Sequence, residues 1–179
     1  MKRISESGRS MIEMLGVLAI IGVLTIGGLD IVGKARQSAQ VSNLVAEISS
    51  IAATARRLSC QYDSGYGSYT KMIYLSQAYS DALTYSSNEF TGPMDTTIKI
   101  TGDKSAFRIS VEGLEEDACM RLATTNWGSD KIQGFLGVCI GTCTGGNGTS
   151  GGSEGLSQAT AAEKCSDNST VLLNYKGCR

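Results

Sequence analysis

The sequence contains no histidine and only one proline, Pro93. Without histidine, the chain lacks the commonest general base of enzymes and the commonest metal ligand. No nucleophile–base pair is visible in the sequence, so we expect that the protein is not an enzyme. Basic residues form no dense patch and the formal net charge is −1, which argues against nucleic-acid binding because such binders concentrate positive charge.

Charge is also scarce in residues 11–29, an apolar segment whose only charged residue is Glu13. The segment approaches the ~20 residues that a helix needs to cross a bilayer. A carboxylate at membrane depth costs about 2.5–3.5 kcal/mol at the helix centre and less near an end, so Glu13 is a functional candidate. The alternatives are a secretory signal peptide, whose apolar core has about 7–15 residues, and a plain membrane anchor, which does not need Glu13.

The residues before Glu13 favour another interpretation. A short basic leader with Lys2 and Arg3 is followed by Gly8, and the glutamate comes five residues later. This pattern resembles the prepilin signature of type IV pilins. The resemblance implies that residues 1–8 are a leader removed by a prepilin peptidase after Gly8, and that the mature chain begins at Arg9. It also implies that Glu13 pairs with the positive N-terminus of a neighbouring subunit during assembly.

An amphipathic pattern follows the apolar segment. Apolar residues recur at steps of three and four, which is typical of one buried helix face: Val41, Leu44, Val45, Ile48, Ile51, Ala52, Ala55 and Leu58. We therefore predict one helix over residues 9–59. Its first part, to about residue 36, lies in the membrane or the filament core, and residues 37–59 pack on a globular head.

The head, residues 60–179, reads as mixed helix and strand. Apolar and polar residues alternate in several short segments, and glycine-rich turns separate them. Six of the seven tyrosines lie between residues 60 and 95; we expect them to cover the helix and core, or alternatively to contact another subunit. We predict strands at 96–101, 106–111, 131–140 and 170–175, helices at 71–83, 114–124 and 159–165, a turn at 88–95 and a loop at 141–155.

These elements predict an α+β fold, in which a long N-terminal helix packs on an antiparallel β-sheet. The loop at 141–155 is rich in glycine but lacks the glycine-lysine-serine/threonine ending of a phosphate-binding loop. We therefore expect no nucleotide and no other cofactor.

Six cysteines stand at positions 60, 119, 139, 143, 165 and 178. An even number after an export signal indicates disulfides formed outside the cytoplasm. Cys139 and Cys143 form a C-x-x-x-C motif, but no second close pair and no histidine support a zinc site, so we expect no bound metal. Six cysteines allow fifteen pairings, so the sequence alone does not fix the connectivity.

A second resemblance narrows these pairings. Residues 106–123 (AFRISVEGLEEDACMRLA), followed by Ala-Glu-Lys-Cys at 162–165, resemble type IVb pilins, the group that includes the major subunits of toxin-coregulated and bundle-forming pili. The resemblance implies a Cys119–Cys165 disulfide that closes a surface region, residues 119–165. Cys139–Cys143 is then a plausible local pair, which leaves Cys60–Cys178. Arg9, where the family has a hydrophobic residue, and the short leader depart from the type IVb pattern.

The resemblance implies a structural function. We expect the major subunit of a type IV pilus of the IVb branch, for adhesion, aggregation or conjugative contact. It would reside in the bacterial inner membrane and then in an extracellular filament. Its partners would be copies of itself, the prepilin peptidase and the inner-membrane assembly machinery. The alternatives are a minor pilin and a pseudopilin of a type II secretion system.

Overall fold

The computed structural model describes residues 7–61, 67–102, 105–128, 134–142 and 155–177. The chain divides into two compact units, Met1–Ala39 and Gln40–Arg179. The first helix, α1, runs over Ser7–Gln61 and contributes to both units. It begins and ends two residues beyond the predicted range of 9–59, and Gly8 and Arg9 lie in its first turn.

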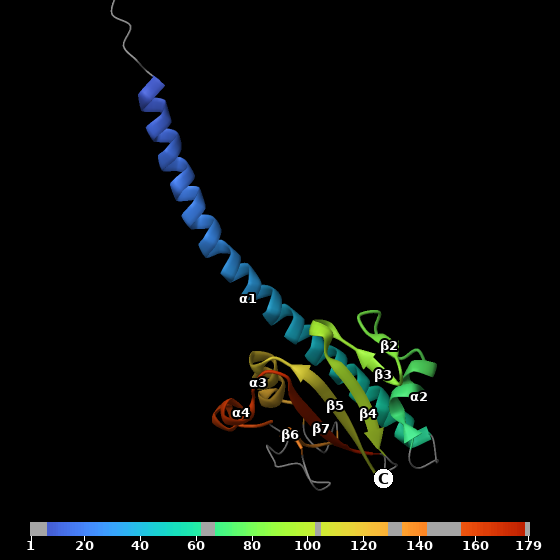
Figure 1. The fold of residues 1–179 in the computed structure, drawn as a ribbon. Helices are drawn as coiled ribbons and strands as arrows, with labels where there is room; N and C mark the ends of the chain where they lie inside the picture. The colour runs from blue at the N-terminus through green and yellow to red at the C-terminus, as the bar shows by residue number, and fades with distance from the viewer. Residues whose placement is uncertain (1–6, 62–66, 103–104, 129–133, 143–154, 178–179) are drawn as a thin grey trace, which may run out of the picture. The chain divides into compact units, whose positions relative to one another are not determined.

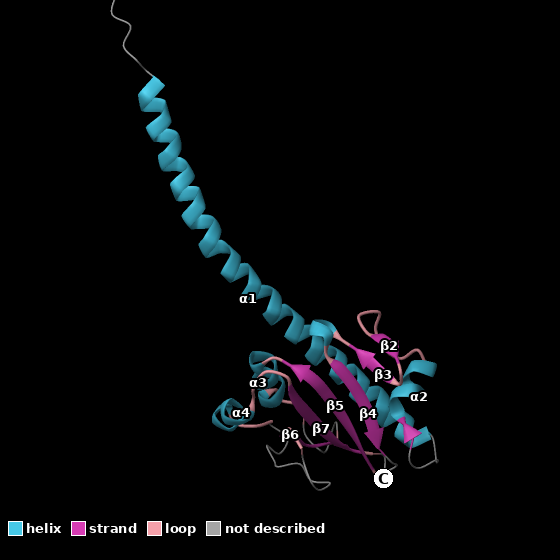
Figure 2. Ribbon diagram, in the orientation of Figure 1, coloured by secondary structure: helices cyan, strands magenta, loops and turns pink. Residues whose placement is uncertain are grey.

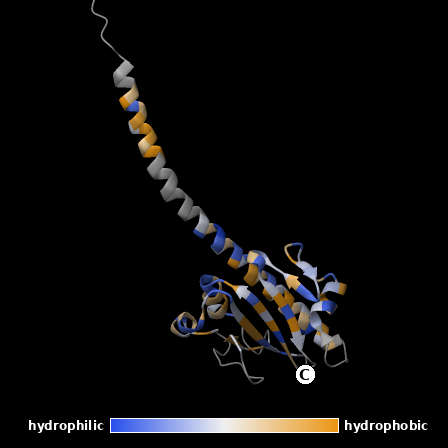
Figure 3. Cartoon of the chain, in the orientation of Figure 1, coloured by the Kyte–Doolittle hydropathy of each residue, from blue (hydrophilic) through white to orange (hydrophobic). Residues whose placement is uncertain are grey.

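The first unit consists, among the described residues, of the part of α1 that precedes Gln40. Figure 3 shows strongly hydrophobic residues in this part of the helix. Within the part of the chain that the structure describes, no helix is both long and apolar enough to cross a membrane.

The second unit is built on the remainder of α1. Seven side chains of this part are buried, with exposures of 0–7%: Val41, Leu44, Ile48, Ile51, Ala52, Ala55 and Leu58. They are the predicted stripe except for Val45, which is partly buried at its margin. The stripe joins the hydrophobic core formed with the sheet, so the helix period read from the sequence is confirmed here.

The strands of the described residues form one seven-stranded antiparallel sheet. Its order is β2-β3-β4-β5-β7-β6, and β1 pairs with β4. The strands are β1 Gly67–Ser68, β2 Thr84–Ser86, β3 Glu89–Thr91, β4 Thr97–Gly102, β5 Ala106–Leu114, β6 Phe135–Ile140 and β7 Ser169–Lys176.

The central strands alternate between two faces. Core-facing residues such as Ile98, Ile100 and Ile109 have no exposed surface, and Figure 1 shows α1 running behind this sheet. The residues between them form a polar outer face, on which Lys99 contacts Glu89 at 3.1 Å and Glu112 at 3.4 Å. The period of two in residues 96–111 thus corresponds to one buried and one polar face.

Three shorter helices complete the unit: α2 (Tyr69–Leu75), α3 (Glu116–Thr124) and α4 (Gln158–Lys164). Ser157 caps α4, since its side chain accepts a hydrogen bond from the backbone N–H of Thr160. Trp127 lies beyond the end of α3, where its indole N–H donates to the carbonyl oxygen of Leu122 at 3.1 Å. The buried residues of α3 and α4 belong to the same hydrophobic core as α1.

Two predictions for residues 71–95 are wrong. The helix predicted over 71–83 ends at Leu75, because Gln77 has a φ of +50° and breaks the helical path. The turn predicted over 88–95 is a hairpin of β2 and β3 followed by a 3₁₀ helix at Pro93–Asp95. Ser87 and Asn88 connect the two strands with positive φ angles of 52° and 68°, as a tight two-residue hairpin loop requires.

Burial of Tyr175 in the core can be tested through the pH dependence of stability. Tyr175 is 1% exposed and stacks on Phe107, with the ring centroids 5.1 Å apart. Burial raises the pKa of the Tyr175 hydroxyl above its ordinary value of 10.0. Above that pH the unfolded chain loses this proton while the folded chain keeps it. This group therefore lowers the free energy of unfolding as pH rises, by up to ~1.4 kcal/mol per pH unit.

We accordingly expect the Tyr175→Phe variant to lose less stability than the wild type between pH 10 and about 11.5, as measured by urea unfolding. Tyr74→Phe is the matched control, because Tyr74 is 39% exposed; it should follow the wild type. Equal losses of stability in the wild type and the Tyr175→Phe variant would show that burial of the Tyr175 hydroxyl does not cause the pH dependence.

Candidate assembly surfaces

An exposed apolar surface covers the first part of α1. Eight large apolar side chains there are 53–74% exposed: Met11, Ile12, Met14, Leu15, Val17, Leu18, Ile20 and Ile21. Glu13 lies among them and is exposed as well. A continuous apolar surface of this kind on a soluble monomer usually marks a binding or membrane-contact surface.

The predicted assembly residues lie at one end of this surface. Gly8 and Arg9 are helical residues of α1, five and four positions before Glu13 respectively; the other leader residues, except Ser7, lie outside the described residues. A Cβ atom added at Gly16 would meet no atom within 4 Å. This small residue therefore leaves open space at which another helix can approach closely.

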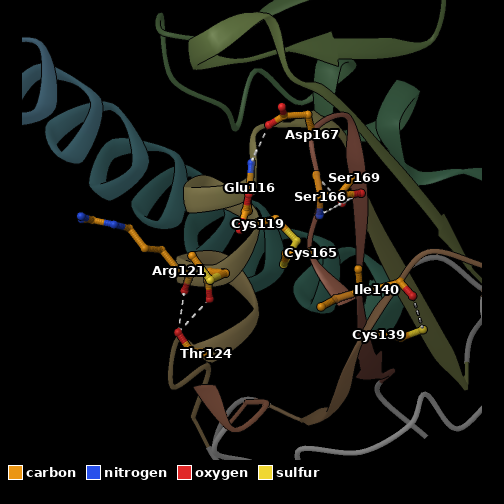
Figure 4. Close-up of a disulfide and its surroundings, with 11 residues drawn as sticks. Glu116, Cys119, Arg121, Thr124, Cys139, Ile140, Cys165, Ser166, Asp167 and Ser169 are labelled. Atoms are coloured by element: carbon orange, nitrogen blue, oxygen red, sulfur yellow. Dashed lines mark hydrogen bonds between the residues drawn. A yellow bond between two sulfur atoms is a disulfide. The ribbon is translucent and has the colours of Figure 1, made fainter. Parts of the chain in front are cut away.

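A disulfide joins α3 to the segment after α4. The sulfur atoms of Cys119 and Cys165 are 1.99 Å apart and their Cα atoms 5.8 Å apart. Cys119 lies within α3, and Cys165 follows the last residue of α4 (Figure 4). Both residues are buried. The pairing is the one that the resemblance to type IVb pilins implied.

Hydrogen bonds beside the disulfide tie the start of α3 to the segment that follows α4. The backbone N–H of Glu116 donates to Asp167 Oδ1 at 3.3 Å (Figure 4). The hydroxyl of Ser169 donates to the carbonyl oxygen of Ser166 at 2.6 Å and accepts from the N–H of Ser166 at 2.9 Å. The start of α3 is thereby tied to the turn that leads into β7.

A close backbone contact holds the other end of α3. The N–H of Leu156 donates to the carbonyl oxygen of Ala123 at 2.8 Å. Gly155 has a φ of +79°, and a Cβ atom there would lie 2.7 Å from the carbonyl oxygen of Thr125. Glycine is therefore required at this approach.

The two helices enclose a surface hollow. A cavity of about 380 Å³ lies between them, lined by Asp117, Met120, Arg121, Thr124, Gln158, Ala161 and Ala162. Arg121 and Asp117 form an ion pair across one helical turn, at 3.0 Å. The region closed by the disulfide thus presents an apolar hollow with a charged rim.

Two further cysteines, Cys60 and Cys139, are also disulfide-bonded. None of the described cysteines is free. Cys143 and Cys178 lie outside the described residues, so the Cys139–Cys143 and Cys60–Cys178 pairs stay predictions. In the same described ranges, no group of three or more histidine, cysteine, aspartate or glutamate side chains lies close enough together to hold a metal ion.

The tyrosines of residues 60–95 were expected to cover the helix and core or to contact another subunit, but the stacking of two of them on the second unit was not predicted. Tyr74 of α2 stacks on Tyr85 of β2, with ring centroids 3.9 Å apart and planes 10° from parallel. Leu75 beside them is 68% exposed, whereas Tyr69 is buried. The many tyrosines of residues 60–95 indicated that aromatic contacts form in this region, but their spacing in the sequence does not show which rings stack. Tyr62 and Tyr66 lie outside the described residues.

No protein-family model matches the chain, and no curated protein has a matching sequence. The likeness to type IV pilins therefore consists of residues in two places. Gly8, Arg9 and Glu13 carry it at the N-terminus, and their roles stay predictions. Cys119 and Cys165 carry it in the second unit, where the structure joins them.

The disulfide yields a stability prediction. Cys119 and Cys165 are 46 residues apart in sequence, and a cross-link over such a loop stabilises by about 4 kcal/mol in the chain-entropy account. We expect the Cys119→Ala/Cys165→Ala double variant to lose roughly this free energy of unfolding in urea titrations. Replacing both cysteines leaves no new thiol to mispair. A loss below about 1 kcal/mol would show that this cross-link has little effect on stability.

Proposed function

We propose that the chain is the major structural subunit of a type IV pilus, of the IVb branch, and polymerises through its N-terminal helix. The observation that carries this proposal is Glu13, an exposed carboxylate within an exposed apolar helix surface. An apolar surface of this kind needs lipid or other helices to cover it. A carboxylate inside such a contact needs a cation, because an unpaired buried charge is strongly destabilising.

The chain supplies a suitable cation when it is cut after Gly8. The new α-amino group of Arg9 is positively charged, and it belongs to every copy. If one copy's amino group meets the Glu13 of the next, each subunit uses two different surfaces. Such heterologous contacts extend into open helical filaments rather than closed rings.

The resemblance to type IV pilins, together with these two surfaces, gives the proposed life cycle. The subunit waits in the bacterial inner membrane with lipid around residues 11–29. A prepilin peptidase removes residues 1–8, and the assembly machinery then transfers the helix from lipid into a bundle of like helices. The second unit faces outward on the extracellular filament, where it serves adhesion, aggregation or conjugative contact.

The second unit is suited to exposure outside the cell. Its buried Cys119–Cys165 bond favours an oxidising compartment, since disulfides persist there. The hollow between α3 and α4, and the exposed Leu75 with the Tyr74–Tyr85 pair, are surfaces that neighbouring heads or external partners can contact. These features support a filament subunit whose outer surface is stabilised by covalent bonds.

Processing gives the first test of this proposal. We expect filament subunits to begin at Arg9, because Gly8 precedes it and Glu13 follows at the distance that the prepilin signature requires. Intact-mass measurement and N-terminal sequencing of purified filaments give the answer. A Gly8→Leu variant should keep residues 1–8 and form no filaments. Filaments built from subunits that retain Met1 to Gly8 would overturn the proposed processing.

Glu13 gives the second test. The Glu13→Val and Glu13→Gln variants should remain in the membrane fraction, because the substitution removes a charge from an apolar segment. Filament yield should fall by about tenfold or more, because the neighbour's amino group would be left without a partner. Glu47→Gln is the matched control, a carboxylate on the second part of the same helix. Normal piliation with Glu13→Val would show that the carboxylate has no assembly role.

A further inference from the structure

The bond at which processing is proposed lies inside a helix. α1 begins at Ser7, so Gly8 and Arg9, which flank that bond, are both helical residues (Figure 1). In an α-helix the carbonyl oxygen of each residue accepts a hydrogen bond from the N–H group four residues later. In this pairing the carbonyl group of Gly8, which hydrolysis must attack, is engaged by the N–H of Ile12.

A closed helical turn protects this bond from hydrolysis. The plane of each peptide group lies along the helix axis, so one face of the group is turned to the closed interior and the other is flanked by side chains. Proteases therefore act on locally opened segments, and the cleavage rate follows the population of the open form when opening and closing are fast. Helices gain and lose terminal residues on a nanosecond scale, which places this bond in that regime.

The sequence of the first turn of α1 favours opening. The turn contains no acidic residue, although a negative charge near a helix N-terminus is stabilising. Residue 9 is arginine, and a positive charge near this end is unfavourable for the same reason. Residue 8 is glycine, the poorest helix former after proline. The first four N–H groups of any helix also lack partners within it, so this turn is held by few favourable interactions.

The rest of α1 does not share this tendency. From Val41 onward the apolar stripe is buried in the core, so unwinding there would expose apolar surface to water. Around residues 11–29 the proposed environment is lipid, in which an opened turn would leave backbone N–H and C=O groups without partners. Residues 7–10 precede that segment, where opened backbone groups can pair with water. Opening is therefore local to the turn that carries the cleavage point.

We propose that local opening of the first turn of α1 controls processing, so that the helix-forming tendency of residues 7–10 determines the cleavage rate. This inference rests on the proposed function, because it concerns its processing step. In the open form held by the peptidase, water adds to the carbonyl carbon of Gly8 and the bond to the nitrogen of Arg9 breaks. Residues 1–8 leave with a carboxylate on Gly8, and both protons of the water end on the nitrogen of Arg9 as its α-ammonium group.

The first experiment measures cleavage of the full-length precursor, isolated in detergent from cells without the peptidase. A limiting amount of prepilin peptidase is added, and intact mass follows the loss of residues 1–8. We expect Ser10→Gly to be cleaved about fivefold faster than Ser10→Ala, with the wild type between them, because glycine disfavours and alanine favours the closed helix. A lost contact between the Ser10 hydroxyl and the peptidase would instead slow both variants.

The matched controls place the same two substitutions at Ser50, an exposed position of α1 far from the cleavage point. Ser50→Gly and Ser50→Ala should both be cleaved at the wild-type rate. They change the helix-forming tendency of α1 by the same chemistry but leave its first turn intact.

The second experiment measures opening without the peptidase. Amide hydrogen exchange of the same precursors, followed by NMR in detergent, reports how often the N–H of Ile12 leaves its partner. We expect this N–H to exchange about fivefold faster in Ser10→Gly than in Ser10→Ala, whereas the N–H of Ile48, in the buried stripe, should exchange at one rate in both.

The outcomes separate this inference from the proposed function. Cleavage after Gly8 at equal rates in the two Ser10 variants, or at rates that do not follow the exchange of Ile12, would overturn the control by helix opening and leave the proposed processing intact. No cleavage after Gly8 in any precursor, the wild type included, would refute the proposed processing and this inference with it.

Discussion

The packing of α1 against the inner face of the sheet is the constraint on which the second unit depends. Seven side chains between Val41 and Leu58 are almost fully buried, and they share one core with the apolar face of β4, β5 and β7. An antiparallel sheet with one apolar face needs such a cover, because its other face is polar and solvated. Ala52 and Ala55 keep the middle of the stripe small, which lets a helix pack closely on neighbouring side chains.

The two parts of α1 differ in how their apolar side chains are buried. From Val41 onward the apolar residues follow the helical period and are buried within the chain, so the stability of that part comes from its own sheet. In residues 11–21 the apolar side chains surround the helix and are exposed, so the described residues of the chain do not bury them. A helix that is apolar on all sides is stable only in lipid or among other helices. The two parts of α1 therefore differ in what buries them. Residues 41–58 pack on the sheet of the same chain, whereas we propose that residues 11–21 are buried by other subunits during assembly.

The sequence was sufficient to predict a helix or strand wherever a periodic pattern of apolar residues had a single physical cause. The stripe from Val41 to Leu58 and the alternation around Ile98 and Ile109 both reflect burial on one side, and both appear in the structure. The β2–β3 hairpin was missed because each strand has three residues, too few for a period of two to show. The Cys119–Cys165 bond could not come from spacing, since fifteen pairings were open; family resemblance implied it. The stacked Tyr74–Tyr85 pair depends on how α2 meets the hairpin, which is tertiary information.

The disulfides divide the second unit by accessibility. Cys119 and Cys165 join two elements that the core already holds, and burial shields their sulfur atoms from external thiols. Cys60 lies instead at the end of α1, where the helix leaves the stripe and its last turn faces a cavity lined by two arginines. The Cys119–Cys165 cross-link is therefore protected by the fold itself, because the core that positions its two elements also covers its sulfur atoms.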